Sequence, residues 1–516
     1  MVPADSKAFG PPPRKRIYLI APRNPHNFWS MQATADAVGV RALMPNNALA
    51  TLVALTPPEV GVEYIYCDEN LDAVRWDTSC DLVALTGYTL HSPRLVELSA
   101  AFRQRGIPVA LGGAFATLDP EQARGLADYF FQGEAEYTWP RFLREWTAGH
   151  AQSSYEQTEF VDLADSPPPD WSFVRGSDYL YFTVQTSRGC PNRCDFCDAI
   201  RIVGRKHRSK PIDSVMTEIR NAHACGAETV FFSDDNFYVR KGYTRELLER
   251  VAAWNSQLES PLSFSCQASV TIADDDAMLR LLADARMSVV FLGVESLRRA
   301  CLEEVHKAHL HRDNLADRIR AMSRHGILPF IGLIVGFDHD DASTFDEIER
   351  FLDATGSPIA SISVLNAPKH TVLHDRLHAL GRIRDQFAGK WHDLTNVVPA
   401  SMPVEELIGR HRELFARLYE PERFERRAAQ WLRNVDYYPT LYRHKKPKAS
   451  KLLKGLHAFR YYLFQARPQA RRMFFHLLRE SWRTDRRLIR KAITIATQYC
   501  HYQSFVQNAD WQAARG

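Results

Sequence analysis

The sequence has no run of about 18 uninterrupted apolar residues, the length that a membrane-spanning helix needs. Its first residues are polar and then rich in proline, so they lack the apolar segment of a secretory signal peptide. Neither sign of charge is in large excess, because the chain has 65 Lys and Arg and 61 Asp and Glu, a net charge of +4. These features predict a globular protein of a reducing, cytoplasmic compartment, and 516 residues allow about two to four domains.

Cysteine is sparse, with nine residues in the chain, yet three of them lie within eight positions. They are Cys190, Cys194 and Cys197, spaced C-x3-C-x2-C after the strand-like segment 181–186. Three thiolates on a loop that leaves a strand suit an iron–sulfur cluster with one iron left open. Zinc is an alternative that needs a fourth ligand, for which His207 is the nearest candidate, and plain buried or disulfide-bonded cysteines are another. We expect the other six to be buried thiols.

The N-terminal part, residues 1–150, alternates short apolar strands with helical segments. The expected strands are 16–21, 62–66, 82–85, 108–111 and 128–131. This order predicts an α/β fold with a doubly wound parallel sheet, whose ligand lies at the carboxyl ends of the strands. Glycines follow several of these strands, where the backbone can approach a ligand closely or simply make a tight turn.

Residues 151–180 contain three consecutive prolines and are predicted to be a semi-extended linker. From 181 to 395 the alternation resumes, with six expected strands that fit an open, partial (β/α)6 barrel. Polar residues fall at the carboxyl ends of these strands, where barrel enzymes place their functional groups. They are Asp234, Asp235, Asn236, Gln267, Glu295, Ser296 and Asp338. Helix capping or turn formation is the alternative role for the Asp and Asn residues, and Glu295 needs a charged or hydrogen-bonding partner.

Residues 396–516 read as a helical C-terminal domain with an uneven charge. Between Arg443 and Lys491 there are 16 Lys and Arg but only two acids, so the rest of the chain carries 4 − 14 = −10. Aromatic residues interleave with these basic residues. The pattern suits an anionic membrane surface. A basic face that is merely solvated and nucleic-acid binding are the alternatives.

The cysteine motif, with the aromatic Phe196 before its last cysteine, resembles the radical S-adenosylmethionine (SAM) superfamily. The resemblance implies a 4Fe-4S cluster held by the three cysteines, with SAM bound to the open iron and cleaved by electron transfer to a 5′-deoxyadenosyl radical. It also implies SAM contacts from Phe196, Arg208, Asp234, Asp235, Asn236, Gln267, Glu295 and Ser296. No residue with a catalytic role beyond cofactor binding is identified.

The upstream order of strand, Gly-Gly, a further strand and Gly-Glu-Ala-Glu resembles the cobalamin-binding domain of cobalamin-dependent radical SAM enzymes. The implied cobalamin contacts are Thr86, Gly87, Gly112, Gly113, Gly133 and Glu134. The chain contains no D-x-H-x-x-G motif, so no histidine from that motif is expected below the cobalt.

Two further segments are similar to hopanoid C-2 methylases: Gly-Phe-Asp338-x-Asp340 and Leu-Tyr-Glu-Pro-Glu422. The cobalamin-dependent tetrapyrrole enzymes, among them the anaerobic tetrapyrrole cyclases, share both segments. The loop Pro368-Lys-His370-Thr371 departs from the Pro-Gly-Thr turn of those enzymes, so the resemblance does not carry the substrate over.

The resemblance implies methyl transfer to an unactivated carbon of a lipid-like or other natural-product substrate. An oxidoreductase or cyclase without methyl transfer is one alternative, and a non-catalytic membrane-associated binding protein is another. The implied partners are a small-molecule substrate and an electron donor such as flavodoxin or ferredoxin, with nucleic acid disfavoured. A cytoplasmic protein peripheral to the inner membrane face is expected.

Overall fold

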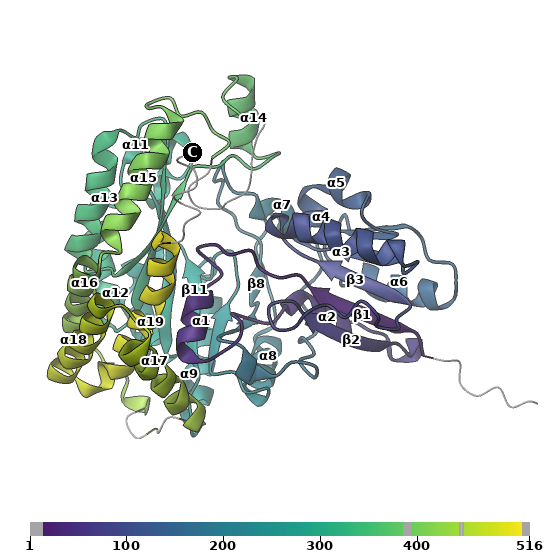
Figure 1. Cartoon of the computed structure of the whole chain (residues 1–516), viewed down its shortest axis with the longest axis horizontal. Coiled ribbons are helices and arrows are strands. Elements are labelled where there is room, and N and C mark those ends of the chain that lie inside the picture. The colour runs from purple at the N-terminus through teal and green to yellow at the C-terminus, as the bar shows by residue number, and fades with distance from the viewer. Residues whose placement is uncertain (1–13, 385–394, 443–444, 446–447, 508–516) are drawn as a thin grey trace, which may run out of the picture. The chain divides into compact units, whose positions relative to one another are not determined.

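The computed structural model of the chain describes residues 14–384, 395–442, 445 and 448–507 (Figure 1). It divides into two compact units. The first comprises residues up to 24 together with 46–173, and the second comprises 25–45 together with the chain from 174 onward. A short N-terminal segment therefore belongs to the unit formed by the distant C-terminal part of the chain.

The first unit is built on a six-stranded, wholly parallel sheet of order β2-β1-β3-β4-β5-β6. Its strands are β1 (Arg16–Ala21), β2 (Glu63–Asp68), β3 (Leu82–Thr86), β4 (Val109–Gly112), β5 (Tyr129–Gln132) and β6 (Ser154–Glu156). Its helices are α2 (Asn47–Ala54), α3 (Ser92–Gln104), α4 (Ala114–Leu118), α5 (Pro120–Arg124) and α6 (Thr138–Thr147). The order reverses between β1 and β3, as in a doubly wound fold.

Successive strand residues point to opposite sides of this sheet, and helices pack against each side, so both of its faces are buried. One apolar cluster contains Tyr18, Val83 and Leu111 with Phe102 of α3. The other contains Leu19, Ala84 and Ala110 with Trp139 and Phe142 of α6. The predicted doubly wound α/β fold is confirmed.

The predicted linker begins with a strand that the sequence did not indicate. Strand β6 pairs in parallel with β5, and Val161, Leu163 and Trp171 beyond it are buried. Segment 151–173 is therefore a packed extension of the first unit, because its backbone completes the sheet and its apolar side chains have partners.

Residues 25–45 form a crossing segment that packs within the second unit. Helix α1 (Gln32–Val38) contacts the C-terminal helices α17 (Ala449–Phe464) and α19 (Ile489–Gln507). Phe28 is fully buried and stacks on Tyr502 with ring centroids 4.9 Å apart. The Thr34 hydroxyl donates to the carbonyl of Thr497 at 3.1 Å. Segment 1–150 is thus divided between two units, which its strand and helix pattern alone did not reveal.

The second unit contains a six-stranded parallel sheet of order β14-β13-β12-β11-β10-β7. Its strands are β7 (Phe182–Val184), β10 (Thr229–Phe232), β11 (Ser263–Ala268), β12 (Met287–Glu295), β13 (Leu328–Val335) and β14 (Ile359–Val364). Its helices are α8 (Ile212–Ala224), α9 (Lys241–Gln257), α10 (Asp276–Asp284), α11 (Arg299–Glu304), α12 (Leu315–Arg324), α13 (Ala342–Thr355) and α14 (Val372–Ala379). Within the described residues β7 and β14 are the two open ends, as expected for a partial barrel.

The C-terminal helices cover one open end of the barrel. They include α15 (Val404–Leu418), α16 (Pro421–Asn434) and α18 (Pro468–Thr484), besides α17 and α19 (Figure 1). The Tyr419 hydroxyl donates to the carbonyl of Ala360 at 2.7 Å and accepts from its amide at 3.2 Å. These two bonds occupy backbone groups of the edge strand β14, which stabilises an edge that would otherwise be exposed. No helix in the described ranges is long and apolar enough to cross a membrane.

Candidate functional site

The three clustered cysteines lie on a loop whose base is a short antiparallel ribbon. Strand β8 (Ser187–Arg188) pairs with β9 (Arg208–Ser209), and the loop between them contains α7 (Ala199–Val203). Gly189 begins the loop with φ of +93°, and a Cβ there would stand 2.3 Å from the carbonyl oxygen of Lys206. Only glycine combines that φ with so close an approach.

Cys190, Cys194 and Cys197 are free, half-buried thiols. Burial raises the pKa of all three, that of Cys197 to about 11. The Lys307 ammonium opposes this rise at Cys190 and Cys194. Three thiols and a buried cation on one loop edge fit an anionic iron–sulfur cluster, since thiolates bind iron and a positive charge offsets theirs.

A single metal ion such as zinc would need several ligand side chains gathered close together. In the described part of the chain, no three His, Cys, Asp or Glu side chains gather so as to hold one ion. His207, the predicted fourth zinc ligand, is half-buried and burial lowers its pKa.

Lys307 is the principal functional candidate that sequence reasoning missed. It is buried, its ammonium forms an ion pair with Glu295, and it lies 5.8 Å above the ring of Phe196. Burial disfavours its charged form, but Glu295 and the neighbouring thiols of Cys194 and Cys197 raise its pKa. The charged partner that Glu295 was expected to need is therefore Lys307, twelve residues along the chain. The predicted desolvation cost was the signal that could have directed a search for such a lysine.

Glu295 is held in an unusual backbone conformation at the carboxyl end of β12. Its φ is +64°, and the register with β13 shifts between Gly293 and Glu295. A Cβ at Gly293 would stand 2.6 Å from the Glu295 carboxylate, so any larger residue there would make that carboxylate shift. A positive φ in a non-glycine residue is costly and occurs often at functional sites. The adjacent Ser296 is buried and accepts a hydrogen bond from the Arg298 amide at 3.1 Å.

The polar residues after β10 have two roles: Asp234 and Asn236 form hydrogen bonds within the fold, and Asp235 contacts the cysteine loop. The buried Asp234 accepts hydrogen bonds from the Thr186 hydroxyl at 3.0 Å and the Ser187 hydroxyl at 2.8 Å, and it fastens the base of the cysteine loop. Burial raises its pKa to about 7. Asn236 accepts from the amides of Tyr238 and Ser269, the turn-forming role that the sequence left open.

Asp235 and Gln267 lie next to these residues. Asp235 accepts a hydrogen bond from the Gly189 amide, and its charge acts on the Cys190 thiol. Of the residues after β10 it is therefore the one beside the cysteine loop. The Gln267 amide donates to the carbonyl of Asp234 at 2.8 Å.

Phe196 and Arg208 belong to the cysteine loop itself. Phe196 packs against the buried cluster that contains Cys301, Val305 and Phe337. The Arg208 guanidinium donates to the carbonyl of Val203 at 3.0 Å, joining the end of the loop to α7. The structure thus brings the predicted SAM residues to one edge of the barrel, and their contacts with SAM stay a prediction.

A second acid in the cysteine loop was also missed. Asp195 is buried, and its carboxylate lies 2.8 Å from His306 Nδ1 and 3.9 Å from the Arg376 guanidinium. Its backbone carbonyl accepts from the Leu373 amide of α14 at 3.0 Å. Asp195 therefore connects the loop to α14, a role that no local pattern could indicate because its partners lie 111 and 181 residues away.

The predicted cobalamin residues lie at the carboxyl edge of the first unit's sheet. Gly113 has φ of +90°, and a Cβ there would stand 2.3 Å from the Thr86 hydroxyl. Gly133 has φ of +85°, and its Cβ would stand 2.5 Å from the carbonyl of Gln157. Glycine at these positions is required by the chain's own packing, in line with the tight-turn alternative.

The other predicted cobalamin residues also contact the chain. A Cβ at Gly87 would lie 3.0 Å from His91, and one at Gly112 would lie 3.1 Å from Phe131. The Glu134 carboxylate accepts from the Val161 amide at 2.7 Å, which fastens the extension beyond β6. The part of the edge that follows β3, β4 and β5 therefore presents mainly backbone to a ligand.

His91 is the buried histidine nearest this edge. Its Nδ1 accepts from the Tyr88 amide at 3.0 Å, so Nε2 carries the proton and donates to the Asn24 side-chain oxygen at 2.9 Å. Burial lowers its pKa to about 4, which keeps the ring neutral. Both ring nitrogens are occupied, so His91 is not arranged as a metal ligand.

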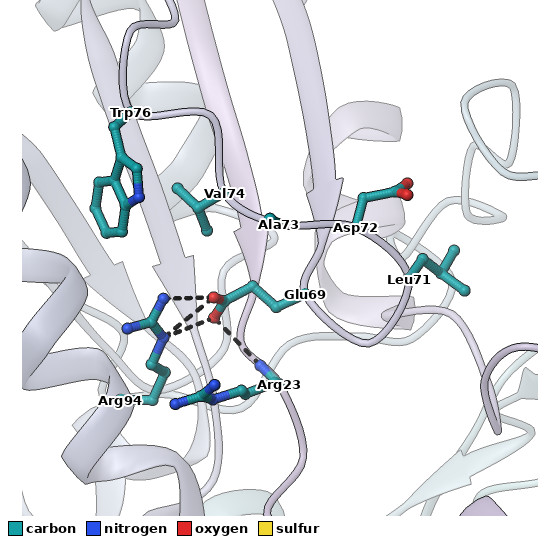
Figure 2. Close-up of a pocket in the computed structure, with 8 residues that line it drawn as sticks. All are labelled: Arg23, Glu69, Leu71, Asp72, Ala73, Val74, Trp76 and Arg94. Atoms are coloured by element: carbon teal, nitrogen blue, oxygen red, sulfur yellow. Dashed lines mark hydrogen bonds and ion pairs between the residues drawn. The ribbon is translucent and has the colours of Figure 1, made fainter.

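One cavity of about 370 Å³ lies beside the ends of β1 and β2 (Figure 2). Arg23, Glu69 and Arg94 line it with Trp76. Figure 2 shows the Arg94 guanidinium turned to the Glu69 carboxylate, which it contacts at 2.6 Å. The Glu69 carboxylate also accepts from the Arg23 amide at 3.3 Å. None of the predicted cobalamin residues lines this cavity, and its Glu69 carboxylate is already paired with Arg94.

Comparison with protein families matches residues 184–352 to the radical SAM superfamily. Residues 371–514 match a domain of unknown function, DUF4070. The first match contains the cysteine loop, Asp235, Glu295 and Lys307.

Curated relatives cover most of the chain. An uncharacterized methyltransferase of Synechocystis, sll1242, is 32% identical over 79% of this chain and 76% of its own. The hopanoid C-2 methylase of Rhodopseudomonas palustris is 27% identical over 79% of this chain and 77% of its own.

A solved structure shares the fold across nearly the whole chain. The radical SAM methyltransferase TsrM of Kitasatospora setae, with cobalamin and a 4Fe-4S cluster bound, has a TM-score of 0.64 and 14% identity. The match covers 93% of this chain and 99% of that one. With the cysteine loop at the edge of a partial barrel, the family match and a relative above 30% identity, the chain belongs to the radical SAM superfamily.

Proposed function

We propose that the protein is a cobalamin-dependent radical SAM methyltransferase that methylates an unactivated carbon. The observation that carries this proposal is the barrel edge, where three free thiols, Asp235 and the buried Lys307–Glu295 pair meet around one loop. The relatives named as methyltransferases support methyl transfer over other radical chemistry.

At the barrel edge, the chain's residues bind and orient cofactors. Cys190, Cys194 and Cys197 would hold the 4Fe-4S cluster, while Lys307 offsets the charge of the thiolates. Glu295, presented by its strained backbone, and Asp235 are suited to the amino group or ribose hydroxyls of SAM. When bound, the cluster and SAM supply one-electron bond cleavage, and cobalamin supplies the methyl group.

At the edge of the first unit, cobalamin would rest on the backbone that follows β3, β4 and β5. Thr86, Gly87, Gly112 and Gly113 would contact it there, with Gly133 at the end of the next strand. His91 is neutral and has both ring nitrogens in use, which supports a lower face without a histidine ligand.

The loop Pro368–Thr371 would adjoin the substrate. The Arg201 guanidinium of the cysteine loop donates to the carbonyl of Lys369 at 3.1 Å, and His370 has φ of +63°. The Thr371 hydroxyl accepts from the His374 amide at 3.2 Å and begins α14. A loop fixed in this way against the cysteine loop can exclude water from the radical site. The name of the hopanoid relative supports a lipid-like substrate.

We also propose that an electron donor such as flavodoxin or ferredoxin reduces the protein. The protein would lie on the periphery of a membrane. The basic C-terminal region supports the membrane contact, although part of its charge points inward. Lys451 donates to the carbonyl of Pro261 at 2.7 Å, Lys454 pairs with Glu228 at 2.9 Å, and half-buried Lys491 donates to the carbonyl of Gly326. The exposed arginines therefore carry most of the available charge.

The test is anaerobic incubation of the reconstituted full chain with methyl-labelled SAM, a reductant, cobalamin and a lipid extract. We expect labelled methyl in a lipid product together with 5′-deoxyadenosine, and neither with the Cys194→Ala variant. Formation of 5′-deoxyadenosine with an unlabelled, oxidised product would favour the oxidoreductase or cyclase alternative and contradict methyl transfer.

A further inference from the structure

Helix α17 exposes large apolar side chains along one face. Phe464 is 72% exposed, Leu452 61% and Leu456 60%. The face also includes Leu453, Phe459 and Leu463, with Phe475 of α18 beside it. The rings of Phe459 and Phe475 are 5.6 Å apart, so this neighbouring side chain extends the same patch. We call these seven residues the α17 face.

The opposite side of α17 fixes the orientation of the helix. Ala458 and Tyr462 are fully buried, and the Tyr462 ring stacks on Phe474 with centroids 4.2 Å apart. Lys451 and Lys454 point to the barrel side, where they bond to Pro261 and Glu228. At 100° per residue the exposed apolar residues occupy one side and these anchors the other. The outward direction of the α17 face is therefore set by packing.

The charged side chains that α17 itself carries have one sign, and the acid of the neighbouring α1, Asp36, acts on Tyr461. Helix α17 contains no Asp or Glu. Arg460 is exposed and lies one turn after Leu456 and one turn before Phe464. Exposed Arg467 and Arg472 follow at the end of the helix and one turn before Phe475. A long arginine stem can lie along apolar surface while its guanidinium reaches a more polar layer.

We propose that the α17 face docks this protein onto an anionic lipid bilayer, with α17 lying in the plane of the interface. A row of leucine and phenylalanine side chains suits the acyl boundary, and arginines among them suit lipid phosphates. A nucleic-acid backbone would use the guanidinium groups but leave the leucines in water. This deepens the membrane part of the proposed function, and it requires neither the cluster nor methyl transfer.

The proposal differs from attraction by the basic region as a whole. Apolar insertion resists salt, whereas attraction between exposed charges is screened. Removing the chain beyond Pro439 cannot test it, because α19 supplies buried Tyr499 and Tyr502 to the core. Point variants on the exposed face leave that core intact.

The experiment is flotation of the full chain with phosphatidylglycerol-containing vesicles and with pure phosphatidylcholine vesicles, at low and high salt. The variant Leu456→Gln/Phe464→Gln removes apolar area without changing charge. We expect its partition onto the anionic vesicles to fall about tenfold or more at both salt concentrations. Arg460→Gln/Arg467→Gln should weaken binding at low salt and change it little at high salt.

A matched control places the same polar substitution at exposed apolar sites elsewhere. Val96→Gln/Leu380→Gln should bind vesicles as the unsubstituted protein does. Equal binding by the α17-face variant and the unsubstituted protein would overturn the proposal. So would a chain that ignores vesicles but forms a dimer that the α17-face variant dissociates, because a second copy would then cover the face. Vesicle binding can be measured whether or not the enzyme transfers methyl groups.

Discussion

The two parallel sheets end in carboxyl edges of opposite character. The barrel edge gathers ionisable groups, with Lys307, Glu295, Asp234 and Asp235 around the cysteine loop. On the first unit, the edge that follows β3, β4 and β5 is formed mainly by glycines and a neutral His91, and the charged Glu69 that follows β2 is paired with Arg94. A charged site suits an anionic cluster and the zwitterionic end of SAM, while a backbone-lined edge suits a large cofactor held mainly by shape. The same strand–helix alternation has thus produced two different kinds of binding edge.

The largest effect expected at the barrel edge comes from the cysteines. Cys190→Ala, Cys194→Ala and Cys197→Ala should each abolish reductive SAM cleavage, because each removes a cluster ligand. Iron content and 5′-deoxyadenosine formation measure this. Cys225→Ala is the matched control, because this cysteine is also half-buried but lies at the C-terminal end of α8. Full SAM cleavage by any of the three loop variants would remove the basis of the assignment.

The ion pair at the same edge should matter for folding as well as binding. Lys307→Leu leaves the Glu295 carboxylate without its buried partner, so the free energy of unfolding should fall by about 3 kcal/mol. Chemical denaturation of the cofactor-free chain measures this. Lys307→Leu/Glu295→Leu should recover much of the loss because neither charge remains. Additive losses in the double variant would show that the pair is not coupled.

The base of the cysteine loop offers a test of backbone geometry. Gly189→Ala must place a Cβ against the Lys206 carbonyl, and we expect a loss of about 3 kcal/mol and poor cluster retention. Gly149→Ala is matched in φ, at +80° against +93°, but has open space around it. It should cost about 1 kcal/mol. Similar losses in the two variants would contradict the close approach at Gly189.

Asp234 should give the barrel edge a dependence on pH. Burial raises its folded pKa from 3.8 to about 7, so the folded state holds a proton that the unfolded state has released. The unfolding free energy of the cofactor-free chain should therefore fall as pH rises from about 4 to 7, by about 3 kcal/mol in total. Asp234→Asn should lack this decline. A parallel decline in both proteins would assign it to another group.

His91 should give the other edge the opposite dependence. Burial lowers its folded pKa from 6.5 to about 4, so the unfolded state takes up a proton first as pH falls. Stability should drop by about 2 kcal/mol between pH 7 and pH 5. His91→Gln should be less stable at pH 7 but flatter over this range. If acidification affects both equally, His91 is not the group responsible.

The strands and the cysteine loop could be predicted because their signals are local. Apolar runs of four to eight residues bounded by turns identify parallel strands, and three thiols in eight positions identify a ligand loop. The course of residues 25–45 could not be predicted, since its partners Thr497 and Tyr502 lie more than 460 residues away. Lys307 was missed because a helix separates it from Glu295 in the sequence, and only the fold brings the two side chains together.

The roles of individual polar residues were harder to predict than their location. Asp234, Asp235 and Asn236 are adjacent in sequence, yet Asp234 and Asn236 bond within the scaffold and Asp235 contacts the start of the cysteine loop. The direction in which each of these side chains points depends on its hydrogen bonds to residues of other strands and loops. The direction of the basic C-terminal side chains was likewise beyond the sequence, because packing turns Lys451, Lys454 and Lys491 inward.

The contrast between the two edges is tested most directly by counting metals in one pair of proteins. The full chain and its Cys190→Ala/Cys194→Ala/Cys197→Ala variant are reconstituted anaerobically with iron, sulfide and hydroxocobalamin, then analysed for iron and cobalt. The account predicts about four irons and about one cobalt per unsubstituted chain, and cobalt without iron in the variant. The cob(II)alamin spectrum of both should lack a nitrogen-ligand signature in electron paramagnetic resonance. A full chain that holds its iron but no cobalt would contradict the account.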